Sequence, residues 1–290
     1  MSGFGERLAG ALEVYGGLCV GIDPHAALLA DWNLPASAAG VREFGLRVVE
    51  AAAGRVGVVK PQVAFYERYG SAGFAALEEV QAAARAAGLI VIADAKRGDI
   101  GSTMDGYAAA WLEPGAPLEA DAVTVSPYLG PASLRGTITA AVRAGKGVFV
   151  LAATSNPEAA GLQSAEVTTV DARQGQTVAD WVATGVSWAN RVAAADGGLG
   201  PVGLVVGATV DRDAVGLTDE ALRAAPILAP GFGAQGVELR AVREVFGVHA
   251  PRVLASASRS VLAAGPEGVV GTIEAHRREL AAATEEEHRV

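Results

Sequence analysis

Charged side chains of opposite sign lie close together in one short segment of the sequence. The apolar run Leu89–Asp94 (LIVIAD) ends on a carboxylate, and Lys96 and Asp99 follow within five residues. Lys96 is two residues beyond Asp94, so both side chains lie on one side of an extended chain. Gly98 permits a turn before Asp99. Neighbouring carboxylates keep a lysine protonated, and a fixed ammonium group can donate a proton to a carbanion.

Two other apolar runs also end on charged residues. Lys60 ends RVGVVK, and Asp23 ends LCVGID. Buried charges are costly unless they are paired or used, so several of them at strand ends indicate a functional site. A set of structural ion pairs is the alternative interpretation. A fixed aspartate facing a substrate carboxylate would favour the loss of that carboxylate, a form of ground-state destabilisation.

Eight short apolar runs recur along the chain, and most are continuously apolar, which is typical of strands buried on both faces of a parallel sheet. They span 18–23, 55–60, 89–94, 121–126, 147–152, 202–207, 226–230 and 252–256. The segments between them have helical spacing, with Ser37 and Ser71 as starting signals and glycines as stops. We expect helices over 37–54, 71–88, 133–145, 178–195, 211–224 and 234–247.

Eight β-then-α units of this length predict a (β/α)8 TIM barrel, with residues 1–290 as a single domain. A doubly wound sheet is the alternative. Active sites of such barrels lie at the carboxyl ends of the strands, where the charged residues stand. The connection 154–180 is long and is expected to be a lid or rim excursion, with an inert surface loop as the alternative. The polar tail 285–290 is expected to fray.

The composition excludes several classes of protein. A net charge of −9 and 51% hydrophobic residues argue against a disordered chain and against a nucleic-acid binder. The single cysteine, Cys19, excludes a disulfide framework and a cysteine-based zinc site, and it is expected to be buried. The four histidines, including His25 near the barrel rim, lack metal-ligand spacing. No signal peptide or membrane span is recognised, so we expect a cytoplasmic protein without a membrane partner.

The charged pattern resembles that of the orotidine 5′-phosphate decarboxylase family. Its D-x-K-x-x-D motif matches Asp94, Lys96 and Asp99. Lys60 in VVKPQVAFYERYG and Asp23 in CVGIDP resemble the family's strand-two lysine and strand-one aspartate.

This resemblance extends from Gly17 to Leu262. The TSNP stretch at 154–157 and the Ser258–Arg259 pair are similar to the type 2 branch, which includes mycobacterial enzymes. Membership implies a carboxy-lyase that converts orotidine 5′-phosphate to UMP and carbon dioxide, the last step of de novo UMP synthesis. It also implies that no cofactor and no metal are needed.

The resemblance implies catalytic roles for four residues. Lys96 would donate the proton to C6 of the pyrimidine. Lys60, Asp94, Lys96 and Asp99 would form a charged tetrad. Asp99 would enter the site from the partner subunit of a homodimer that shares its active sites.

Further substrate contacts follow from the same resemblance. Ile100 and Thr103 would cross the dimer interface together with Asp99. Asp23 would contact the ribose hydroxyls, and Ser126, after the fourth strand, would contact the base.

The loops after the last two predicted strands are suited to a phosphate group, which barrels often bind there. Glycines let backbone N–H groups approach an anion, a helix beginning near Gln235 adds its positive end, and Arg259 can form a bidentate pair. The family resemblance also implies a glutamine and an arginine here. A simple turn is the alternative. The candidate phosphate-site residues are Pro230, Gly231, Gly233, Gln235, Gly236, Ser258 and Arg259.

Two other functions remain open at this stage. One is a Mg²⁺-dependent sugar-phosphate decarboxylase or aldolase of the same barrel superfamily, which also carries D-x-K-x-x-D. Lys60 argues against it, because a second lysine suits a metal-free cationic site. The other is a phosphosugar- or nucleotide-binding barrel without catalysis, which the four charged positions disfavour.

Overall fold

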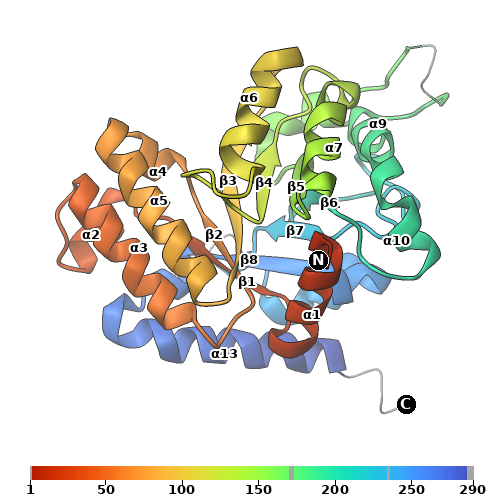
Figure 1. The fold of residues 1–290 in the computed structure, drawn as a ribbon. Coiled ribbons are helices and arrows are strands. Elements are labelled where there is room, and N and C mark those ends of the chain that lie inside the picture. The colour runs from red at the N-terminus through yellow and green to blue at the C-terminus, as the bar shows by residue number, and fades with distance from the viewer. Residues whose placement is uncertain (1, 170–172, 234–235, 286–290) are drawn as a thin grey trace.

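The strands form one closed parallel barrel (Figure 1). The computed structural model describes residues 2–169, 173–233 and 236–285. Each strand pairs with the next one in the sequence, and the last pairs with the first. The strands are β1 (Leu18–Ile22), β2 (Val58–Pro61), β3 (Ile90–Arg97), β4 (Ala122–Val125), β5 (Gly147–Ala153), β6 (Val202–Val206), β7 (Ile227–Pro230) and β8 (Val253–Ala257). The predicted (β/α)8 barrel is therefore confirmed.

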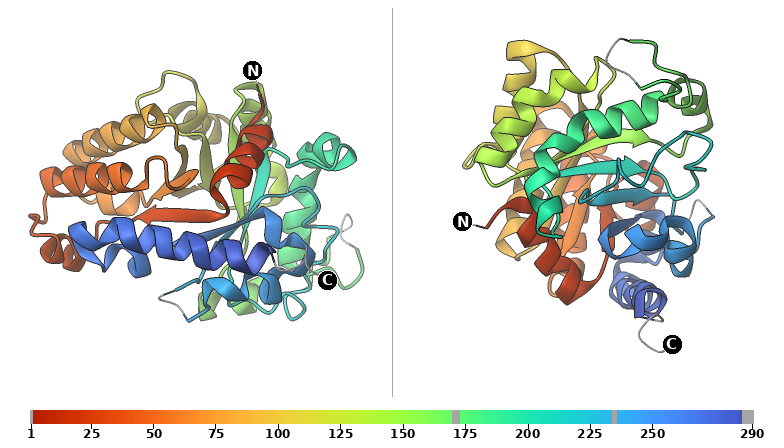
Figure 2. Two further views of the ribbon diagram at one scale, coloured as in Figure 1. Left: turned by 90° about the horizontal axis from the view of Figure 1, so that it is seen from below. Right: turned by 90° about the vertical axis from the view of Figure 1, so that its right-hand side faces the viewer.

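Helices cover the outside of this barrel, as the turned views of Figure 2 show. The α-helices are α1 (Phe4–Tyr15), α2 (Ala26–Asp31), α3 (Ala38–Ala52), α4 (Ala64–Glu67), α5 (Gly70–Ala86), α6 (Gly101–Leu112), α7 (Arg135–Arg143), α8 (Ala160–Gln163), α9 (Val178–Val186), α10 (Arg191–Ala195), α11 (Val242–Phe246), α12 (Arg259–Leu262) and α13 (Gly265–Glu285). Short 3-10 segments are η1 (Pro131–Leu134), η2 (Pro157–Ala159), η3 (Ser187–Asn190), η4 (Leu239–Ala241) and η5 (Gly247–Arg252). No described helix is both long and apolar enough to cross a membrane.

Most predicted helices are present, but some of them begin at other residues than the sequence predicted. Ser37 caps α3 as expected, because its hydroxyl accepts a hydrogen bond from Gly40 N–H at 3.2 Å. Ser71 does not cap α5, which begins one residue earlier at Gly70. The helix predicted from residue 234 is wrong in its start, because the first helical residue of the described chain there is Leu239. Residues 234, 235 and 286–290 lie outside the described residues, so most of the expected frayed tail is not described.

The helix predicted over 211–224 is wrong, because this segment consists of turns. The Asp211 carboxylate accepts hydrogen bonds from the N–H groups of Asp213 and Ala214, at 3.0 and 3.1 Å. Gly216 then adopts a φ of +63°, which a helix does not permit. An aspartate that turns the chain onto itself competes with helix formation.

Helix α1 closes the amino-terminal end of the barrel. Neither this helix nor its position was predicted from the sequence. Phe4 and Leu8 are buried among the side chains that fill the barrel interior, with Phe4 edge-on to Phe149 at 6.1 Å between ring centroids. Arg7 adds an ion pair to Asp121 at 2.7 Å. Cys19 is fully buried in the same interior, as expected. One end of the barrel is thus filled, and the other end is left for a ligand.

Candidate active site

A cavity of about 520 Å³ opens at the carboxyl ends of the strands. Its wall contains Asp23, Lys60, Asp94, Lys96 and Arg259, all of which the sequence identified as candidates. A cavity of about 630 Å³ at the opposite end of the barrel, between α1 and α13, contains none of them. The charged cluster therefore identifies the first cavity as the candidate active site.

Asp94 holds both lysines with one carboxylate. Lys60 Nζ lies 3.0 Å from Asp94 Oδ2, and Lys96 Nζ lies 2.6 Å from Asp94 Oδ1. The Lys60 side chain is 8% exposed, whereas that of Lys96 is 47% exposed. Lys60 is therefore a fixed buried cation, and Lys96 is the ammonium group that can reach a ligand in the cavity.

Two uncharged donors complete the coordination of Asp94. Gln62 Nε2 donates to Oδ2 at 3.1 Å, and Thr124 Oγ1 donates to Oδ1 at 3.0 Å. Both residues line the cavity, and sequence reasoning missed both of them. Their positions held a usable signal, because Gln62 lies two residues after Lys60 and Thr124 is the polar residue within a strand that is otherwise apolar.

Opposite charges keep this cluster ionised. Burial alone would raise the pKa of Asp94, but the ammonium groups of Lys60 and Lys96 together hold that pKa well below its usual range. Burial alone would lower the pKa of Lys60, but Asp94 and Asp23 raise it above the usual lysine value. Asp94 and Lys60 therefore remain charged throughout the neutral pH range.

An irregularity in β3 directs Lys96 into the cavity. The pairing of β3 with β4 shifts between Ala93 and Arg97, so the chain bulges at this point. Lys96 has a φ of +49°, a left-handed conformation that is uncommon for a residue with a side chain. Its N–H donates to Thr124 Oγ1 at 2.9 Å, which stabilises the bulge. Bulges of this kind often re-aim side chains near active sites.

Asp23, a residue of the cavity wall, has a buried acceptor atom without a partner. Among the described residues, its Oδ1 atom is buried without a hydrogen-bond partner, and so are His25 Nε2 and Ser258 Oγ. All three residues line the cavity. A Cβ atom on Gly21 would lie 2.7 Å from Ser258 Cβ, so glycine is needed for this close approach. Buried polar atoms normally have partners, so these three unpaired atoms distinguish this part of the cavity wall.

The predicted phosphate loops meet at one side of the cavity. Pro230, Gly231, Ser258 and Arg259 line it, and Arg259 makes no ion pair within the described part of the chain. Gly233 and Gly236 lie in the same loop with φ values of +70° and +104° but do not line the cavity. The candidate Gln235 lies outside the described residues.

Besides Gly233 and Gly236, four other predicted residues do not line the cavity of their own chain. Asp99, Ile100 and Thr103 lie at the start of α6, where Asp99 Oδ1 accepts from Ile100 N–H at 2.8 Å and Ile100 is 61% exposed. Ser126 follows β4, with its N–H bonded to the carbonyl of Arg97 at 2.7 Å. The structure thus brings together Lys60, Asp94 and Lys96, but not Asp99.

The start of the long connection after β5 forms another part of the wall. Thr154, Ser155 and Asn156 line the cavity. Leu151, Val205 and Leu228 add apolar surface from three strands. This combination of an apolar floor and a polar rim suits a planar ring that carries hydrogen-bonding groups.

Residues 16–269 match the model of a family described as orotidine 5′-phosphate decarboxylase / HUMPS. The orotidine 5′-phosphate decarboxylase of Corynebacterium glutamicum is 48% identical over 264 residues, covering 91% of this chain and 92% of that protein. The enzyme of the same name from Salinispora arenicola is 51% identical over 267 residues, covering 92% of each chain.

Solved structures agree with these sequence matches. A Streptomyces avermitilis protein assigned as an orotidine 5′-phosphate decarboxylase superposes with a TM-score of 0.87 at 44% identity, covering 98% of this chain and 96% of that one. The OMP decarboxylase of Leishmania donovani superposes with a TM-score of 0.73 at 31% identity, covering 97% and 98%.

Proposed function

The chain belongs to the orotidine 5′-phosphate decarboxylase / HUMPS family, and from that premise we propose how its own residues carry out the reaction. The protein is a carboxy-lyase that converts orotidine 5′-phosphate to UMP and carbon dioxide, a step of pyrimidine biosynthesis. Its substrate is a small molecule. The roles of individual residues below are our proposal.

The substrate lies across the cavity with its phosphate at the loops after β7 and β8. Arg259 pairs with the phosphate, and the backbone around Gly231 approaches it closely. The carboxylate of Asp23, a residue of the cavity wall, accepts a hydrogen bond from a ribose hydroxyl. The pyrimidine ring lies over the apolar floor, which directs its C6 carboxylate towards Asp94 and Lys96.

The reaction begins when the bond between C6 and the carboxylate carbon breaks. Carbon dioxide leaves, and the electron pair of that bond remains on C6 as a carbanion. Lys96 then transfers a proton from Nζ to C6, which gives UMP and a neutral lysine that regains its proton from solvent. The fixed charge of Asp94 disfavours the substrate carboxylate before this step, and the two ammonium groups stabilise the carbanion.

One observation carries this assignment: a single buried carboxylate holds two lysines of the cavity wall, one of them buried and the other half exposed. An ion-pair cluster that served only stability would have no need to leave an ammonium group open to a ligand. The relatives at about half identity support the decarboxylase over a Mg²⁺-dependent sugar-phosphate enzyme or a barrel that only binds its ligand.

The test follows the loss of orotidine 5′-phosphate by ultraviolet absorbance. We expect turnover by the wild type in excess EDTA, and no measurable turnover by Lys96→Ala. Because the Lys96 side chain is half exposed, the variant should keep the circular dichroism spectrum of the wild type. Wild-type kcat in Lys96→Ala would refute the proton-donor role, and loss of wild-type turnover in EDTA would favour the Mg²⁺-dependent alternative.

We also propose that the chain, as a single domain, forms a homodimer with shared active sites, in the cytoplasm. Asp99 and Thr103 are then contributed to the partner's cavity. Large apolar side chains exposed near this rim support a contact surface: Ile100 at 61%, Tyr128 at 79% and Leu129 at 51%. Ser126 remains our predicted contact to the base, although Thr124 is the residue of β4 that lines the cavity.

A further inference from the structure

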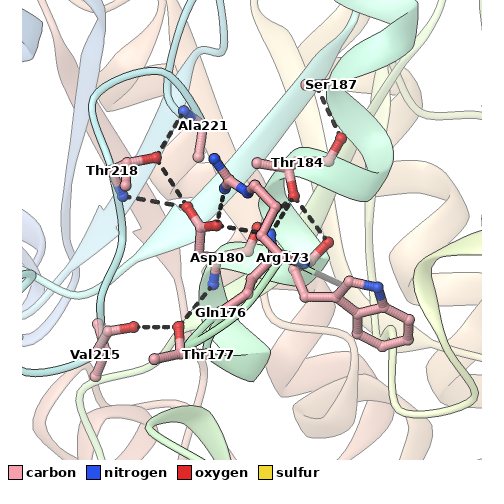
Figure 3. A network of polar contacts seen from close by, with 10 residues as sticks. Arg173, Gln176, Thr177, Asp180, Thr184, Ser187, Val215, Thr218 and Ala221 are labelled. Atoms are coloured by element: carbon pink, nitrogen blue, oxygen red, sulfur yellow. Dashed lines mark hydrogen bonds and ion pairs between the residues drawn. The ribbon is translucent and has the colours of Figure 1, made fainter. Parts of the chain in front are cut away.

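A buried carboxylate outside the active site organises part of the barrel rim. Asp180, in the first turn of α9, is 3% exposed. Its Oδ2 accepts hydrogen bonds from Gln176 Nε2 at 2.7 Å and from the guanidinium group of Arg173 (Figure 3). Its Oδ1 accepts from Thr218 Oγ1 at 2.8 Å. A buried charge is costly unless paired, and these partners satisfy both carboxylate oxygens.

These contacts join two connections at the carboxyl ends of the strands. Two of the partners belong to the β5–α9 connection (154–177), and Thr218 belongs to the β6–β7 connection (207–226). A second link lies next to the first, where Thr177 Oγ1 donates to the carbonyl of Val215 at 2.6 Å. The long connection after β5 is therefore fixed to its neighbour rather than free along its whole length.

The later part of this connection, near Gln176, is hydrogen-bonded to its earlier part, near Ala165, which lies closer in sequence to the cavity residues. Val178 N–H donates to the carbonyl of Ala165 at 2.9 Å, and Val167 N–H donates to the carbonyl of Gln176 at 2.8 Å. These bonds pair residues 165–167 with residues 176–178 in antiparallel orientation. Helix α8 ends at Gln163, two residues before the paired arm begins.

Gln163 connects the end of α8 to the cavity wall through two hydrogen bonds. Its Oε1 accepts from Thr154 N–H at 2.9 Å, and its Nε2 donates to Thr154 Oγ1 at 2.9 Å. Thr154 Oγ1 in turn donates to Asn156 Oδ1 at 2.8 Å. Thr154 and Asn156 both line the cavity, whereas Gln163 and Asp180 do not.

We propose that Asp180 and Gln163 are positioning residues that hold wall residues 154–156 in their binding arrangement before the substrate arrives. The inference rests on the proposed function, because it assigns these residues a role in binding orotidine 5′-phosphate. A wall that is ordered in advance lowers the entropic cost of binding. Its loss therefore weakens the binding of substrate and product, while the chemical step at Lys96 is largely kept.

The experiment compares Asp180→Ala, Gln163→Met, the double variant and a matched control, Asn190→Ala. Asn190 is also buried, at 2% exposed, and bonds the backbone of Val202 at 2.7 and 3.0 Å, but at the start of β6 and not at the rim. The measurements are KM for orotidine 5′-phosphate, kcat, the inhibition constant of UMP, and Tm.

We expect each rim variant to raise KM and the UMP inhibition constant about tenfold, with kcat within about threefold of the wild type. The double variant should bind substrate and UMP as tightly as whichever single variant binds them less tightly, because both residues act through the same segment. Asn190→Ala should lower Tm without changing KM.

The inference is overturned if Gln163→Met binds UMP like the wild type. It is also overturned if the increases in KM of the two single variants multiply in the double variant, or if Asn190→Ala raises KM as much as the rim variants do. Should Asp180→Ala fail to fold, Asp180→Asn takes its place, since it keeps the shape but loses the charge that pairs with Arg173. Absence of turnover in the wild type would instead contradict the proposed function, so the two failures are distinguishable.

Discussion

At the scale of single residues, the active site depends on one carboxylate with several donors. Asp94 bonds Lys60, Lys96, Gln62 and Thr124 at 2.6 to 3.1 Å. Removing a buried charge that neutralises two others leaves those charges unpaired, which costs more than the pair itself contributes. Asp94 therefore links the stability of the barrel to the chemistry that we propose for it.

Asp94→Asn should change how stability depends on pH. The folded pKa of Asp94 lies below its unfolded value, so its ionised form contributes stability above about pH 4 that is lost as the pH falls towards the folded pKa. About one pH unit below the unfolded pKa, near pH 3, the wild type should lose unfolding free energy relative to Asp94→Asn at a rate that approaches about 1.4 kcal/mol per pH unit. Urea unfolding across this range measures the difference. The exposed control Asp31→Asn should follow the wild type, and parallel profiles for Asp94→Asn would contradict the prediction.

The backbone of Lys96 provides a second prediction. A residue with a Cβ atom is strained at a φ of +49°, whereas glycine is not. Lys96→Gly and Lys96→Ala should both be inactive, but the glycine variant should be more stable by about 1 kcal/mol. Chemical denaturation of the two variants side by side measures this. Equal stabilities would mean that the bulge relaxes once the lysine is absent.

At the scale of elements, α1 and the strands divide the barrel into a filled end and a reactive end. Leu8→Ala removes a fully buried side chain from the filled end, and Val14→Ala removes one that is 66% exposed on the same helix. We expect Leu8→Ala to lower the unfolding free energy by about 3 kcal/mol and Val14→Ala to lower it by less than about 1 kcal/mol. Neither should change KM, which steady-state kinetics checks. A raised KM in Leu8→Ala would mean that the two ends are coupled.

The sequence predicted the strands well because most of them are continuous apolar runs, and five of the eight runs end at a polar or charged residue. It predicted helices less well where local polar contacts compete, as at Asp211, and it missed α1, whose first residue enters the barrel interior. In the site, charged residues were found because they are rare at strand ends. Gln62 and Thr124 were missed because uncharged polar residues are common, and only the fold shows that both meet Asp94.

At the scale of the whole molecule, the proposed shared sites predict complementation between inactive variants. In a mixture of Lys96→Ala and Asp99→Ala chains, one site of each hybrid dimer contains an intact Lys96 and an intact Asp99 from its partner. After free exchange of subunits at equal concentrations, about half of the dimers are hybrids, and one of the two sites in each hybrid is intact. About one quarter of all active sites should therefore be restored. Activity is measured after subunit exchange that native mass spectrometry confirms. Exchange without recovered activity would exclude the shared site.

The filled end also bears on how this enzyme can be altered. Because α1 seals the barrel at the end away from the substrate, the apolar packing of Phe4 and Leu8 lies apart from the residues proposed for the chemistry. Substitutions that tighten the sealed mouth, or an attachment to a solid support through it, should leave the catalytic mouth undisturbed. The packing of the sealed end can therefore be changed by protein engineering while the residues of the cavity stay as they are.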